Sequence, residues 1–138
     1  MACQSTTTNP VSISVEASSS LHIFSVAHAA FYQQVILSFN SDMSSPVATF
    51  MGSGEGVPMT LPNGDTFITI ATENNTALYA QFNYSASGPG GPFVPAVAVC
   101  APVIIGQAPS PVMISVTSED HTDNDDNDTY LTIIDLNA

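Results

Sequence analysis

Residues 118–138 read SEDHTDNDDNDTYLTIIDLNA, an acidic loop that runs directly into an alternating apolar strand. Residues 119–128 hold six of the twelve acidic residues of the whole chain, which contains no lysine or arginine. Unit charges about 4 Å apart repel each other by roughly 4 kcal/mol near a protein surface. A compact loop of this composition therefore needs cations, and its all-oxygen ligands favour calcium.

A solvated, disordered acidic run is the alternative interpretation, because this is the usual state of a block of like charges. The apolar alternation of residues 130–134, which begins almost at once, favours an ordered loop.

The rest of the chain has the pattern of an all-β domain. Its 138 residues are 44% hydrophobic and only 9% charged, with ten prolines and eight glycines between short apolar runs. No stretch shows the period of a helix, and about nine short strands recur at a spacing typical of antiparallel sandwiches. We predict an antiparallel β-sandwich over residues 11–138, preceded by a flexible N-terminal arm at residues 1–10.

The formal charge of −12 excludes several classes of partner. Nucleic acids and anionic lipids are bound through lysine and arginine, so we expect neither as a partner. The longest apolar segment, residues 94–105, is too short and too rich in proline to cross a bilayer. Neutral polar ligands and metal ions remain.

The chain start and the cysteines bear on localisation. The first residues, MACQSTTT, do not have the pattern of a secretory signal, so we expect a protein that is cytoplasmic or released without a recognisable signal peptide. The only cysteines are Cys3 and Cys100. We expect free buried thiols, with a disulfide as the alternative.

The acidic loop does not follow the EF-hand pattern, because Asp128 stands at the glycine position and Ile134 at the bidentate glutamate position. Its carboxylates nevertheless suffice for two calcium ions, since each ion takes six to eight oxygens. The expected ligands of the first ion are Glu119, Asp123, Asp125 and Asp128. Asp125 and Asp128 then bridge to a second ion, which Asn127 completes.

This string resembles the calcium loop of the bacterial two-calcium fucose/mannose-binding lectins (the LecB type). That family carries S-E-D-G-T-D-N-D-x-N-D and ends ten residues later, as this chain does after Asp128. Residues 21–40, LHIFSVAHAAFYQQVILSFN, resemble the family's early strand, sugar-specificity loop and following strand. The resemblance runs from Ile13 to the end, with extra residues around 88–110. It implies that residues 11–138 form a calcium-dependent lectin domain.

The resemblance implies the same two calcium ions per subunit and adds two ligands to the second. These are the backbone carbonyl of His28 and the terminal carboxylate of Ala138 of the partner subunit. It therefore implies a homodimer or a higher homo-oligomer. The family has asparagine where this chain has His28, and ends in glycine where this chain ends in alanine.

The resemblance further implies that glycans or monosaccharides are the ligands and that the protein is not an enzyme. The implied sugar-binding residues are His28, Ala29, Ala30, Phe31, Glu119, Asp120, Asp123, Asp125 and Asp128. Ala29 and Ala30 replace hydroxyl side chains, so the sequence does not fix the sugar. Phe31 either stacks on an apolar sugar face or packs into the core.

Two other functions compete with a lectin. The first is a calcium-stabilised structural or adhesion module that has no sugar site. The second is a glycosidase, which we disfavour because its two carboxylates must be separated, whereas these acids are crowded together as metal ligands are.

Overall fold

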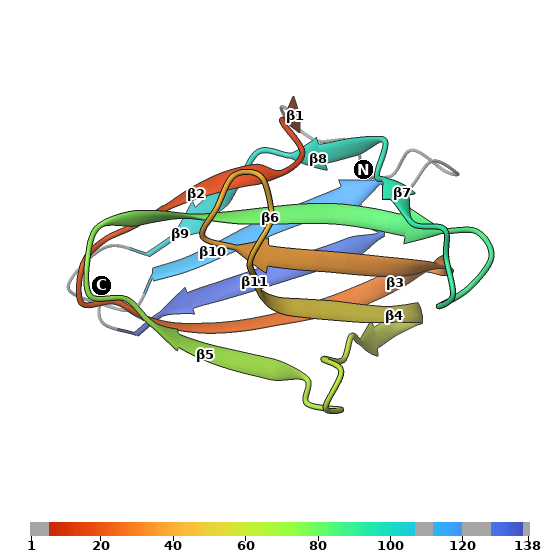
Figure 1. Cartoon of the computed structure of the whole chain (residues 1–138), viewed down its shortest axis with the longest axis horizontal. Helices are drawn as coiled ribbons and strands as arrows, with labels where there is room; N and C mark the ends of the chain where they lie inside the picture. Colours follow the sequence, from red (N-terminus) through yellow and green to blue (C-terminus); the bar gives the residue numbers. More distant parts are fainter. Residues whose placement is uncertain (1–5, 107–111, 120–127, 137–138) are drawn as a thin grey trace.

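The computed structural model describes residues 6–106, 112–119 and 128–136, and its described part consists of strands, turns and loops without a helix (Figure 1). Its strands are β1 (Thr6–Thr7), β2 (Val11–Val15), β3 (Ser20–Ser38), β4 (Pro46–Pro58), β5 (Phe67–Ala71), β6 (Thr76–Ser85), β7 (Val94–Pro95), β8 (Ala98–Cys100), β9 (Val103–Ile105), β10 (Val112–Glu119) and β11 (Thr129–Asp135). The predicted all-β class is confirmed, with eleven strands in these ranges where the sequence suggested about nine.

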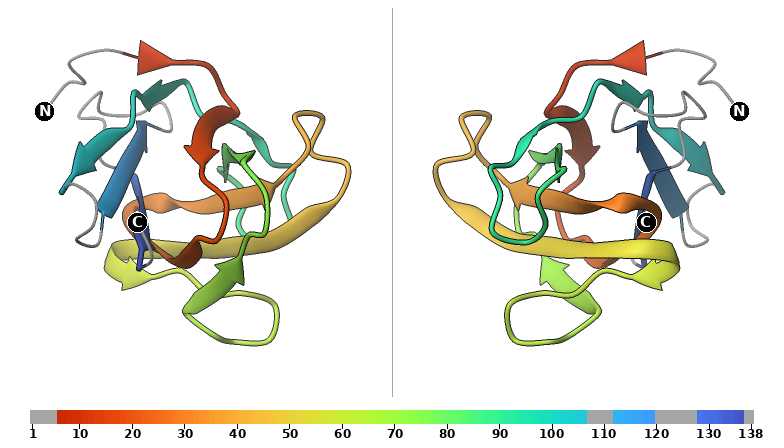
Figure 2. Two further views of the ribbon diagram at one scale, coloured as in Figure 1. Left: turned by 90° about the vertical axis from the view of Figure 1, so that its left-hand side faces the viewer. Right: turned by 90° about the vertical axis from the view of Figure 1, so that its right-hand side faces the viewer.

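All the strand pairings found among the described residues are antiparallel, and they form two layers that are continuous through β3. One layer has the order β1-β8-β10-β11-β3, and the other continues from β3 to β6 and β2. Residues 20–24 of β3 pair with β5 and β11, whereas residues 32–38 pair with β4 and β6. Figure 2 shows β3 and β4 (orange to yellow) extending across the molecule between the layers. The sandwich is therefore one sheet folded onto itself.

β3 is one long strand, whereas the resemblance of residues 21–40 implied an early strand, a loop and a following strand. The burial of its side chains alternates over residues 20–29 and again over 33–37, but not at residues 30–32. This interruption in the period of two is a bulge, not the end of a strand. The two predicted strands are therefore the two halves of one bent element.

The core lies between the two layers, where alternate side chains of each strand meet. Val116, Leu131 and Ile133 come from β10 and β11, and Leu78 and Phe82 come from β6 on the opposite layer, all at most 1% exposed. Burial of a side chain of this size contributes about 1.5–3 kcal/mol. The pattern BeBeB of β2 places its three apolar residues in the same core.

The predicted N-terminal arm is partly paired with the sheet. β1 pairs with β8, where Thr6 lies opposite Cys100. The side-chain amide of Asn9 donates to the Phe82 carbonyl (2.8 Å), and its oxygen accepts from the Phe82 N–H (3.0 Å). Residues 1–5 lie outside the described residues.

The expectation of free thiols is wrong, because Cys100 is disulfide-bonded. The pairing of Thr6 with Cys100 brings the N-terminal segment alongside β8, a contact between distant parts of the chain that residue spacing does not reveal. Cys3, the other cysteine of the sequence, lies outside the described residues.

A membrane-spanning helix is likewise absent from the part of the chain that the structure describes, where no helix has the length and apolarity to cross a bilayer.

Candidate functional site

Glu119 and Asp128 flank the acidic loop at one end of the β10–β11 hairpin. Glu119 is the last residue of β10, and Asp128 directly precedes β11. The Asp128 N–H donates to the Ser118 carbonyl (2.8 Å), and Ser118 lies opposite Thr129 in the register. Both acidic residues are only 1% exposed. The hairpin therefore buries two carboxylates at the point where the loop begins and ends.

These carboxylates lie among other buried polar side chains. Gln33 and Ser118 are 0% exposed and Thr129 is 1% exposed. Within the described residues the Ser118 hydroxyl oxygen has no hydrogen-bond partner, although it is buried. A buried polar group without a partner costs roughly 1–3 kcal/mol. Among the described residues, the Ser118 hydroxyl is thus the buried side-chain oxygen at this end that a ligand could satisfy.

The composition of the chain limits what can neutralise the two carboxylates. Isolated buried charges are strongly unfavourable, so buried carboxylates are normally paired, protonated or bound to metal. The chain has no lysine or arginine, and its only side chains of basic character are three histidines. Carboxylate and hydroxyl oxygens are the hard ligands that calcium prefers. The described residues therefore contribute two carboxylates of the type that calcium prefers, and the other predicted ligands lie outside the described part of the chain.

The backbone of His28 lies directly beside the backbone of Asp128. Its N–H donates to the Asp128 carbonyl (2.8 Å). The His28 ring packs on Tyr130 with centroids 4.7 Å apart, and its Nδ1 lies 3.6 Å from Oε1 of Glu55. The structure thus places the His28 backbone beside Asp128, while ligation of a calcium ion by the His28 carbonyl stays a prediction.

The predicted sugar-specificity residues form a bulge in β3. Ala29 lies opposite Gly54 and Gln33 opposite Gly52, so three residues of β3 face a single residue of β4. Within the bulge Ala30 is exposed and Phe31 is partly buried. Bulges redirect side chains at the ends of sheets and are frequent beside functional sites.

The facing segment of β4 requires glycine. Gly54 has a φ of 112°, and a Cβ added there would lie 2.7 Å from Cγ2 of Val57. Gly56 has a φ of 69° and lies at the register shift between the pairs Ala27–Val57 and His28–Glu55. Other residues rarely adopt these φ values, so the two glycines allow β4 to follow the bulge.

The buried side chain of Gln33 connects the bulge to β11. The hydroxyl of Thr129 donates to Oε1 of Gln33 (2.9 Å), and Nε2 of Gln33 donates to the Phe31 carbonyl (3.0 Å). Thr129 follows Asp128 directly in the sequence. The position of Phe31 therefore depends on the position of β11.

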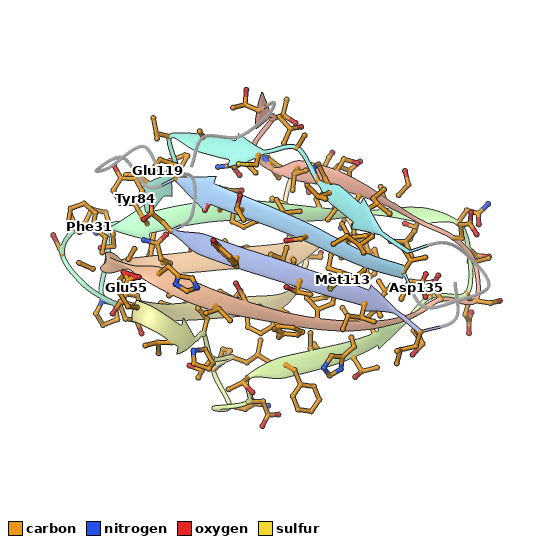
Figure 3. The ribbon with its side chains drawn as sticks, turned by 180° about the vertical axis from the view of Figure 1, so that it is seen from behind. Phe31, Glu55, Tyr84, Met113, Glu119 and Asp135 are labelled. Atoms are coloured by element: carbon orange, nitrogen blue, oxygen red, sulfur yellow. The ribbon has the colours of Figure 1, made fainter. Side chains whose placement is uncertain are left out.

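Phe31 in turn stacks on Tyr84, the penultimate residue of β6, with ring centroids 5.8 Å apart and an interplanar angle of 11°. Figure 3 shows Phe31, Tyr84 and Glu119 at one end of the molecule, with Met113 and Asp135 at the other. Sequence reasoning missed Gln33 and Tyr84. Tyr84 continues the apolar alternation of β6, and nothing in that pattern marks it as part of a site.

Several predicted residues fall outside the described part of the chain. They are Asp120, Asp123, Asp125, Asn127 and Ala138. Among the described residues alone, no group of three or more His, Cys, Asp or Glu side chains is arranged to hold a metal ion.

Comparisons with known proteins locate the fold. No protein-family model and no curated protein matches the chain. A lectin of Chromobacterium violaceum in complex with alpha-methyl-fucoside is similar at a TM-score of 0.68 and 17% identity, covering 92% of this chain and 96% of that chain. A high-affinity mannose-binding lectin of Ralstonia solanacearum is similar at 0.63 and 21% identity, covering 89% and 93%.

The C-terminal domain of the lectin BC2L-C from Burkholderia cenocepacia is similar at a TM-score of 0.62 and 18% identity, covering 92% of this chain and 95% of that domain. All three similarities extend over nearly the whole of both chains, so the resemblance first seen in the acidic string is confirmed at the level of the fold. The chain has the β-sandwich fold of these bacterial lectins.

Proposed function

We propose that this protein is a calcium-dependent lectin that binds monosaccharide ends of glycans and catalyses no reaction. Two calcium ions are held by Glu119, Asp128 and three residues of the loop between them, Asp123, Asp125 and Asn127. Each bound calcium supplies open coordination positions for hydroxyls of a neutral sugar. A chain without lysine or arginine suits an uncharged ligand of this kind.

The burial of Glu119 and Asp128 is the observation that carries this proposal. Two carboxylates that are 1% exposed and flank a loop sequence with four further acids, in a chain without lysine or arginine, favour a bound cation. Two of the similar proteins, a lectin in complex with alpha-methyl-fucoside and a mannose-binding lectin, support a sugar of the fucose/mannose type.

The bulge is the second part of the proposed site. Residues 28–31, together with Asp120 and the calcium ligands, contact the sugar, and the His28 carbonyl completes the second ion. Because the terminal carboxylate from Ala138 of the partner subunit also binds this ion, the assembly is at least a homodimer. Several sites on one assembly convert modest affinity into avidity on a glycan surface.

Calorimetric titration of fucose, mannose and galactose, first with calcium and then with chelator, tests the proposal. We expect the protein to bind at least one of the sugars in calcium and none in chelator. Glu119→Gln and Asp128→Asn should each weaken binding by about 100-fold, because each removes the charge of a ligand. Asp135→Asn is the matched control, since it removes an acid at the opposite end (Figure 3) and should leave binding intact.

Two results would contradict the lectin. Thermal stabilisation by calcium without any heat of sugar binding would favour the structural or adhesion module. Turnover of a chromogenic glycoside would favour a hydrolase.

A further inference from the structure

We propose that Phe31 and Tyr84 together form a stacking subsite for the apolar C–H face of a pyranose ring, beside the proposed calcium site. The inference rests on the proposed function and assigns a role to Tyr84, which the sequence did not single out. The expected ligand is a pyranose with one ring face that presents C–H groups, and no hydroxyls, to the protein.

The geometry of the ring pair suits such a ligand. The two rings are nearly parallel, at 11°, and both side chains are only partly buried. An aromatic pair that served the core alone would be excluded from solvent, as Phe50 and Phe82 are at 0% and 1% exposed. Phe31 and Tyr84 are instead only partly buried at the end of the sandwich (Figure 3), where a ligand of the proposed calcium site would lie.

A short connection ties Tyr84 to Glu119. Val94 pairs with Tyr84, and three residues later the Val97 N–H donates to the Glu119 carbonyl (2.9 Å). Three residues span at most about 10 Å of chain. Strands that pair lie about 4.8 Å apart, so this segment links the end of β6 to Glu119 at the same end of the sandwich (Figure 3).

Phe31 is tied to the same site from the other side. The Gln33 amide joins the Phe31 carbonyl to the Thr129 hydroxyl, and the His28 N–H donates to the Asp128 carbonyl. The two rings therefore come from different strands, and each strand is hydrogen-bonded or linked by a short segment to the backbone of one of the two residues that carry the buried carboxylates. Such double anchoring is what a pre-organised binding wall requires.

The chemistry of the bulge supports an apolar contact. Ala29 and Ala30 carry no hydrogen-bonding group, so this part of the bulge cannot bind sugar hydroxyls through its side chains. A pyranose held at its hydroxyls by cations still exposes C–H groups, and burial of these against flat rings is favourable. The ring pair therefore supplies affinity that the alanines do not.

Substitution of each ring by leucine tests the subsite. Phe31→Leu and Tyr84→Leu keep an apolar side chain but remove the flat ring, and Tyr84→Phe restores it. With calcium saturating, both leucine variants should weaken pyranoside binding about five- to tenfold, in line with the worth of an aromatic contact. Tyr84→Phe should stay within twofold of the original, and the calcium midpoint of all variants should be unchanged.

Phe67→Leu is the matched control. Phe67 is an aromatic residue of β5, 50% exposed and packed on His22 at 4.9 Å, so the variant also removes a partly exposed ring from a ring pair. It should leave sugar affinity unchanged. Circular dichroism and the melting temperature check that each variant folds, and the two leucine variants lie on separate strands, so one suffices if the other does not fold.

A methyl pyranoside and a disaccharide together distinguish which sugar ring of a glycan stacks on the aromatic pair. Weaker binding of a methyl pyranoside shows that the pair contacts the terminal sugar, whereas weaker binding of a disaccharide alone shows that it contacts the next ring. Full affinity of the leucine variants for both classes overturns the subsite while the lectin stands. If the unmodified protein binds neither class in calcium, the proposed function fails, and the subsite with it.

Discussion

The acidic residues at the two ends of the β10–β11 hairpin differ in their exposure to solvent. At one end Asp135 is partly exposed and accepts a hydrogen bond from the hydroxyl of Ser19 (2.9 Å). At the other end Glu119 and Asp128 are 1% exposed, and the sequence between them contains four further carboxylates. Figure 3 shows Asp135 and Glu119 at opposite ends of the molecule.

This difference in exposure has an electrostatic consequence. A partly exposed carboxylate that accepts a hydrogen bond from a hydroxyl can also bind water, so it stays charged at little cost. Carboxylates that are buried near one another are costlier to charge, because a low dielectric strengthens their repulsion. The same strand pair thus carries a more solvated acid at one end and, at the other, the acids that we propose as ligands of a cation.

Removal of calcium should have the largest effect on stability. A ligand that binds only the folded state at 100 times its Kd stabilises it by about 2.7 kcal/mol. For a chain of this size that corresponds to a rise in melting temperature of roughly 8 °C. We expect calcium to produce such a rise, measured by calorimetry against chelator. Asp128→Asn should abolish most of the shift and Asp135→Asn should preserve it.

An equal loss of the calcium shift in both variants would remove the distinction between the two ends. A melting temperature that does not respond to calcium would show that the buried carboxylates are neutralised without a metal.

The hydroxyl of Thr129 should have an intermediate effect. Thr129→Val keeps the shape of the side chain but removes the donor to Gln33, which is 0% exposed. A buried acceptor that loses its partner costs about 1–3 kcal/mol. We expect a loss in this range from urea denaturation, a severalfold loss of sugar affinity through the displaced bulge, and recovery of both in Thr129→Ser.

Ser19→Ala is the corresponding change at the opposite end. It removes the donor to Asp135, but this carboxylate is partly exposed and can bind water instead. The expected cost is about 0.5–1.5 kcal/mol, the usual worth of a hydrogen bond. Thr129→Val is therefore expected to cost more, and the reverse order would contradict the contrast between buried and solvated polar groups.

The sequence was sufficient for features that depend on local pattern. Alternation of apolar residues predicted the strands, including β11 and the core positions Leu131 and Ile133. The charge of the loop marked Glu119 and Asp128 before their burial was known. Local composition determines such features because strand period and charge density act over a few residues.

Features that depend on distant contacts were missed. Gln33 interrupts an apolar alternation and looks solvent-facing in the sequence, yet it is buried because Thr129, 96 residues later, supplies its donor. The continuity of β3 and the disulfide at Cys100 likewise depend on pairing between distant segments. The periodicity of a sequence does not identify partners that are distant along the chain.

The ion pair between His28 and Glu55 should have the smallest effect, although it lies at the functional end. Nδ1 and Oε1 are 3.6 Å apart, and the Glu55 side chain is 81% exposed. Exposed pairs contribute about 0–1 kcal/mol and are screened by salt. We expect Glu55→Gln to change stability by less than about 1 kcal/mol and sugar affinity by less than twofold. Urea denaturation and calorimetry at low and high salt measure both.

Glu73→Gln provides the control for the loss of one negative charge, because Glu73 is exposed on the loop between β5 and β6. The two variants should behave alike at high salt. A large loss of sugar affinity in Glu55→Gln alone would mean that the side chain contacts the ligand or holds the His28 ring against Tyr130. The binding site would then extend from the buried carboxylates to an exposed residue of β4. Solvent exposure would no longer distinguish the acids that bind the ligand from those that do not.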